Sequence, residues 1–78
     1  MEDSLINVAV IGAGKFGVNI LNVLRQLERT TRECRLVAFA EIDESLLAAR
    51  QAEFGVSGYR DCREMLGKER IDAIAVAT

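Results

Sequence analysis

The sequence contains no histidine, no proline and no tryptophan, and it has only two cysteines in 78 residues. Without histidine the chain cannot form a Ser-His or Cys-His catalytic pair, and a zinc site would lack ligands. Cys34 and Cys62 lie far apart without C-x-x-C spacing, so we interpret both as small core residues or surface thiols. We therefore expect no metal site in these residues.

Strong charge and long apolar runs are also missing. The net charge is −2, which indicates no basic surface for nucleic acid, and the 50% hydrophobic content is typical of a globular chain. The run INVAVIGAG is far shorter than the roughly 20 residues that cross a bilayer. The opening MEDSL is acidic where an export signal would be basic. We therefore expect a cytoplasmic location, with neither nucleic acid nor membrane as a partner.

Apolar runs predict four strands along the chain. Continuous runs at residues 7–11, 35–41 and 71–78 are typical of strands buried in a parallel sheet, and VSGY at residues 56–59 predicts a short one. Helical signals fill the intervals between them. The first helix has an apolar face composed of Gly17, Ile20, Leu21, Leu24 and Leu27.

Capping signals delimit the two later helices. Asp43 is the expected N-cap of a helix that stops at Gly55. Asp61 and Glu64 have capping-box spacing before a short helix, CREML, which we expect Gly67 to end. The order β-α-β-α-β-α-β predicts an α/β, Rossmann-like doubly wound parallel sheet with strand order 3-2-1-4. We see no domain boundary within residues 1–78.

Three glycines follow the first strand at G-x-G-x-x-G spacing and precede a helix, the context that favours a dinucleotide site. Gly12 would allow a tight turn, Gly14 would let a pyrophosphate approach bare backbone, and Gly17 would let the helix pack against the strand. The helix N-terminus would stabilise the negative pyrophosphate. The alternative is a strand-to-helix turn without a ligand.

An acidic residue at the end of the second strand is the expected partner of the adenosine ribose. Glu41 closes the run RLVAFAE, whereas Asp43 is better explained as the helix cap. A carboxylate at this place would repel the 2′-phosphate of NADP by roughly 4 kcal/mol at about 4 Å and an effective dielectric near 20. Ile42 follows, with no arginine or serine to attract a phosphate, so we expect NAD rather than NADP.

The remaining loop residues have two possible roles each. Lys15 lies either in solvent at the start of the helix or close to the cofactor phosphates, where it would soften the preference for NAD. Phe16 is interpreted as a packing residue rather than a ligand contact.

The chain as a whole resembles the N-terminal half of a Gfo/Idh/MocA oxidoreductase. The resemblance lies in VAVIGAGKFG, in VAFAEIDESLLAARQAEFGVSGYRD and in IDAIAVAT, with FGVSGYRDCREML the most discriminating piece. Glu41 stands where that family more often has aspartate, a departure that leaves the role open to either acid.

The resemblance implies an NAD(P)-dependent dehydrogenase that acts on a sugar, cyclitol or related polyol. Ala77 and Thr78 would then neighbour the cofactor, and a catalytic lysine in an E-K-P motif would lie beyond Thr78, in a second α/β domain absent from this chain. We therefore expect the 78 residues alone to be inactive and the full-length protein to be a homo-oligomer. The candidate cofactor-binding residues are Gly12, Ala13, Gly14, Lys15, Phe16, Gly17, Glu41, Ile42, Ala77 and Thr78.

Two other functions share these features. One is a regulatory nucleotide-sensing module, of the type that gates transport, which would bind NAD(H) without turnover. The other is an interaction module that keeps the fold without the ligand. Because fold alone does not determine function, these alternatives stay open at the level of sequence.

Overall fold

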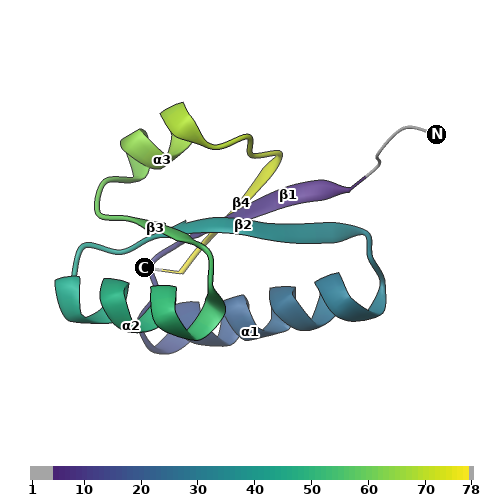
Figure 1. Cartoon of the computed structure of the whole chain (residues 1–78), viewed down its shortest axis with the longest axis horizontal. Helices are drawn as coiled ribbons and strands as arrows, with labels where there is room; N and C mark the ends of the chain where they lie inside the picture. Colours follow the sequence, from purple (N-terminus) through teal and green to yellow (C-terminus); the bar gives the residue numbers. More distant parts are fainter. Residues whose placement is uncertain (1–4, 78) are drawn as a thin grey trace.

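Strands and helices alternate along the chain in the computed structural model, which describes residues 5–77 (Figure 1). The elements are β1 (Ile6–Ile11), α1 (Lys15–Thr30), β2 (Cys34–Ala40), α2 (Glu44–Phe54), β3 (Ser57–Tyr59), α3 (Cys62–Lys68) and β4 (Ala73–Val76). All strand pairs are parallel, and the sheet order is β3-β2-β1-β4. The predicted fold class and strand order are confirmed. Within residues 5–77, no helix is both long and apolar enough to cross a membrane.

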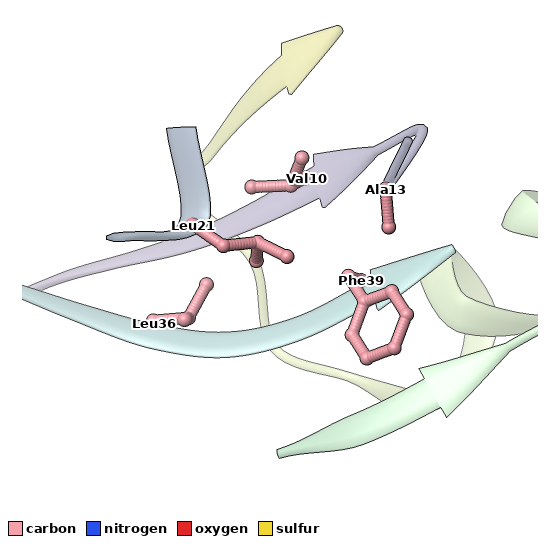
Figure 2. Close-up of a cluster of buried hydrophobic side chains, with 5 residues drawn as sticks. All are labelled: Val10, Ala13, Leu21, Leu36 and Phe39. Carbon is pink, nitrogen blue, oxygen red and sulfur yellow. The ribbon is translucent and has the colours of Figure 1, made fainter. Parts of the chain in front are cut away.

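Helices α1 and α2 cover one face of the sheet and α3 covers the other (Figure 1). The core under α1 and α2 comes from β1, the loop after it, α1 and β2 (Figure 2). Its buried side chains are Val10, Ala13, Leu21, Leu36 and Phe39. Leu36 and Phe39 share this face, despite their odd spacing, because the register of β2 against β1 shifts by one residue between them.

Small residues form the sheet surface under α3. Ala9, Ala38 and Ala40 are buried there against Met65, whose side chain is fully buried. Alanine side chains leave room for a short helix to lie close to the sheet, so Met65 and the partly buried side chains around it fill the space between the two layers. Core packing thus fixes α1, α2 and α3 relative to the carboxyl ends of the strands.

The ends of α2 agree with the sequence signals. Asp43 is the N-cap, and its Oδ1 accepts a hydrogen bond from the Leu46 N–H at 3.1 Å. The helix ends at Gly55, whose φ of 66° lies in the left-handed region that glycine adopts without strain.

The ends of α3 differ from the prediction. Asp61 is the N-cap, but its Oδ1 accepts from the Arg63 N–H at 2.8 Å, and Glu64 pairs with Lys68 at 3.0 Å instead of completing a capping box. Gly67 lies within the helix, so its expected role as the stop signal was wrong. The hydrogen bonds from the Arg63 backbone and side chain lower the pKa of the Asp61 carboxyl below its usual value.

Strand β4 is shorter and more exposed than the predicted buried strand over residues 71–78. Ile74 is 41% exposed and Val76 is 66% exposed, because β4 is the last strand of the sheet within the described residues. Its place beside β1, at the end of the predicted strand order, is confirmed. Next to it, Asp72 Oδ2 accepts from the Asn7 N–H at 2.8 Å.

Candidate functional site

A pocket of about 350 Å³ lies at the carboxyl ends of the strands. The chain leaves β1 for β2 on one side, and β4 returns to its other side, so the strand order reverses here. Ligands of open α/β sheets bind in the crevice at this kind of reversal. The lining residues are Ile11, Gly12, Gly14, Ala40, Glu41, Ile42, Leu46, Arg60, Cys62 and Ala77.

Two of the motif glycines are required by the backbone geometry. Gly12 has a φ of 93°, which a residue with a side chain rarely adopts. A Cβ added to Gly17 would lie 1.9 Å from the Gly12 carbonyl oxygen, so only glycine allows α1 to approach the turn this closely. The end of β1 and the first turn of α1 are therefore in direct contact.

Gly14 is unlike the other two because the space around it is open. Within residues 5–77, no heavy atom beyond the two adjoining residues would lie within 4 Å of a Cβ added there, although Gly14 lines the pocket. It is the N-cap of α1 and provides no side-chain cap, and the first turn of the helix contains no acidic residue. Such an N-terminus offers free N–H donors and a partial positive charge to an anion.

Glu41 connects the two loops that border the pocket. Its Oε1 accepts from the Ala13 N–H at 2.6 Å, and its Oε2 accepts from the Asp43 N–H at 3.0 Å. A carboxylate has about four acceptor positions, so further hydrogen bonds to a ligand hydroxyl remain available. Asp43 instead caps α2, as the sequence predicts.

Sequence reasoning missed two arginines that lie beside the site. Arg50 on α2 donates from Nε to the Ala13 carbonyl oxygen at 3.0 Å. Arg60 follows β3, lines the pocket and pairs with Glu44 at 2.9 Å. Neither contact follows from sequence spacing, since each joins elements that only the fold brings together.

The remaining candidate residues differ in their surroundings. Phe16 is 77% exposed and so does not pack within the described residues, contrary to expectation, and Lys15 is also exposed. Ile42 is 80% exposed at the rim of the pocket, which Ala77 also lines. Thr78 lies outside the described residues.

No group of three or more histidine, cysteine, aspartate or glutamate side chains within residues 5–77 could hold a metal ion. Cys34 and Cys62 are both half-buried free thiols, and Cys62 borders the pocket. The described lining of the pocket offers a ligand backbone donors, the Glu41 carboxylate, the Arg60 guanidinium and an apolar wall.

Residues 6–78 match the GFO_IDH_MocA family, described as an oxidoreductase family with an NAD-binding Rossmann fold. No curated protein sequence matches the chain.

Solved structures with the same fold include three dehydrogenases. The WlbA dehydrogenase from Bordetella pertussis, in complex with NADH and UDP-GlcNAcA, superposes with a TM-score of 0.85 at 23% identity over 100% of this chain. The myo-inositol 2-dehydrogenase from Lactobacillus plantarum gives a TM-score of 0.75 at 29% identity over 95%. The scyllo-inositol dehydrogenase from Lactobacillus casei, with bound NAD(H) and scyllo-inositol, gives a TM-score of 0.72 at 21% identity over 95% of this chain. The chain spans 22%, 21% and 21% of their respective lengths.

Proposed function

The chain belongs to the Gfo/Idh/MocA family of oxidoreductases, and from that premise we propose that it is the cofactor-binding part of a dehydrogenase that uses NAD. The substrate class that we propose is a sugar, cyclitol or related polyol. A relative bound to UDP-GlcNAcA and another bound to scyllo-inositol support this class. The catalytic residues and the substrate pocket would belong to a further domain, outside these 78 residues.

The observation that carries the proposal is the position of Glu41. Its carboxylate lies in the pocket, close enough to the glycine loop to accept the Ala13 N–H at 2.6 Å. A dinucleotide whose pyrophosphate lies at the start of α1 has its adenosine ribose on the side of the second strand. The two features that such a ligand needs therefore line one pocket: free donors near Gly14 and a carboxylate after β2.

Each part of the site has a separate task in this proposal. The bare backbone at Gly14 admits the pyrophosphate, and the N-terminus of α1 stabilises its charge without a basic side chain. Glu41 accepts hydrogen bonds from the ribose hydroxyls. Ala77, and Thr78 after it, would border the nicotinamide end. The bound nicotinamide supplies the hydride acceptor or donor of the reaction.

Glu41 also supports the proposed preference for NAD over NADP. A 2′-phosphate at the ribose would face this carboxylate, at a cost of roughly 4 kcal/mol for like charges about 4 Å apart at an effective dielectric near 20. Arg60 lines the same pocket with the opposite charge, but it is paired with Glu44 at 2.9 Å. The pairing reduces its attraction for a phosphate.

Replacing Glu41 with alanine tests the proposal. We expect Glu41→Ala to weaken NADH binding to the intact polypeptide. The NADPH dissociation constant divided by the NADH dissociation constant should fall at least tenfold, which is about 1.4 kcal/mol. Glu33→Ala is the control, since Glu33 is an exposed glutamate just before the opposite end of β2. Fluorescence titration with NADH and NADPH gives two dissociation constants for each variant and two for the unaltered protein.

Two results would contradict parts of the proposal. Equal affinity of the unaltered protein for the two cofactors would refute the charge argument and would point to Lys15. An intact protein that binds NADH but oxidises no polyol with NAD would favour the nucleotide-sensing module over the dehydrogenase.

A further inference from the structure

Arg50 contacts the glycine loop from outside the pocket. It lies on α2, and its Nε donates to the Ala13 carbonyl oxygen at 3.0 Å across 37 positions of sequence. Its Nη1 lies 3.3 Å from Glu53 Oε1, one turn further along α2, and 20% of the Arg50 side chain is exposed. Neither Arg50 nor Ala13 lines the pocket. The guanidinium therefore holds the loop without entering the space that a ligand would fill.

Ala13 is held from both sides by side chains of opposite charge. Glu41 accepts from its N–H at 2.6 Å, and Arg50 donates to its carbonyl oxygen at 3.0 Å. The N–H belongs to the peptide group before the Ala13 Cα and the carbonyl to the peptide group after it. Since a residue has only two soft backbone dihedrals, fixing both peptide groups fixes the conformation of Ala13.

The bond from Arg50 also sets the direction of the next donor in the loop. In a planar trans peptide group the C=O and the following N–H point in opposite directions. The Ala13 carbonyl points at Arg50 on α2, so the Gly14 N–H points away from α2. Gly14 lines the pocket and is the N-cap of α1, so in the proposed site its N–H would serve as a donor to a phosphate.

We propose that Arg50 is a positioning residue that presets the Gly14 N–H for the dinucleotide phosphates through the Ala13 carbonyl. This inference rests on the proposed function, because it requires a dinucleotide in the pocket. A donor that is already oriented loses little conformational freedom when the ligand binds, so the bond from Arg50 strengthens binding without a contact to the ligand. The nearby Glu53 offsets the charge of Arg50, which limits any direct attraction to the phosphates.

Arg25 provides a matched control within the same domain. It lies on α1, donates to the Phe54 carbonyl oxygen and pairs with Glu28 at 3.2 Å at i,i+3 spacing, as Arg50 does with Glu53. The exposed fraction of its side chain is 24%, close to the 20% of Arg50. The two arginines therefore share their bonding pattern and burial, but only Arg50 contacts the glycine loop.

The experiment compares Arg50→Met with Arg25→Met in the intact polypeptide. NADH is titrated by fluorescence, and ADP-ribose, which keeps the pyrophosphate and lacks the nicotinamide, is titrated by calorimetry. We expect Arg50→Met to raise both dissociation constants about tenfold, equivalent to about 1.4 kcal/mol. Arg25→Met should leave both constants within twofold of the unaltered protein. Arg50→Lys should recover part of the affinity, because a lysine ammonium can donate to the same carbonyl.

Each other outcome has a distinct meaning. Unaltered protein that fails to bind NADH would refute the proposed function itself. Normal binding by the unaltered protein together with constants for Arg50→Met within twofold of it would overturn the positioning role alone. Equal weakening by Arg50→Met and Arg25→Met would show a general loss of stability and would also overturn it. If Arg50→Met does not fold, Arg50→Lys is compared with Arg50→Gln, and equal affinities of these two would overturn the proposal.

Discussion

Substituting Gly17 and Gly14 separately should divide the glycine motif into a folding role and a binding role. A Cβ at Gly17 would lie 1.9 Å from the Gly12 carbonyl oxygen, whereas a Cβ at Gly14 would have no heavy atom within 4 Å. Gly14 also has a φ of −80°, so it is not in the left-handed region that favours glycine. A side chain added at Gly17 should therefore destabilise the fold, whereas a side chain added at Gly14 should weaken binding and leave the fold intact.

The expected magnitudes follow from these distances. Gly17→Ala forces the new Cβ against the Gly12 backbone, and overpacking of this kind costs about 3 kcal/mol. For a domain of 60–100 residues such a loss lowers Tm by roughly 12–24 °C, and by less in a longer polypeptide. Gly14→Val leaves the fold intact but places a branched side chain where the pyrophosphate would approach, so NADH affinity should fall at least tenfold, about 1.4 kcal/mol.

Circular dichroism melts and NADH titrations of the intact polypeptide measure the two effects. Gly14→Val should show a native spectrum and a Tm within a few degrees of the unaltered protein. A Gly14→Val variant that binds NADH normally would show that the glycines serve a turn and nothing more. A Gly17→Ala variant as stable as the unaltered protein would refute the packing argument.

Two further predictions concern α3 and β4. The pKa of the Asp61 carboxyl is lowered from 3.8 in the folded chain. The ionised cap therefore stabilises α3 fully at pH values above 3.8, and this contribution is lost as the pH falls through the lower folded-state pKa. The stability difference between the unaltered chain and Asp61→Asn, from urea titrations, should therefore shrink from pH 6 to pH 2; a constant difference would contradict the role of the charge. Residues 1–78 expressed alone should self-associate through β4, where Ile74 and Val76 are exposed, and Val76→Lys should reduce the association. Light scattering gives the molar mass, and a stable monomer at high concentration would contradict this prediction.

Local sequence signals predicted the order and type of every element in the described part of the chain. Strand runs and helix periodicity arise from neighbouring residues, so they can be recognised without the fold. The cap at Asp43 and the left-handed Gly55 are local in the same sense. The prediction that Gly67 ends α3 failed because glycine weakens a helix without having to end it. The helical turn that contains the fully buried Met65 continues through Gly67.

Properties that depend on distant residues could not be predicted in this way. The exposure of β4 reflects which strands lie beside it, and apolar content alone does not report that. Phe16 was expected to pack, yet the first turn of α1 presents it outward. The sequence singled out Glu41 as the acidic residue of the site, but not its bond to Ala13, and it offered no signal for Arg50, which only the packing of α2 brings to the loop.

The central place of β1 has a consequence for the growing chain on the ribosome. One edge of β1 pairs with β2 soon after it is made, but the other waits for β4 and for Asp72, which bonds to Asn7 across 65 positions. At about 5–20 residues per second of synthesis, that edge stays open for roughly 3–13 s. The side chains in Figure 2 all lie between Val10 and Phe39, so they can pack within this interval. The nascent polypeptide then presents a packed half with an unpaired apolar strand, the form that a chaperone would bind.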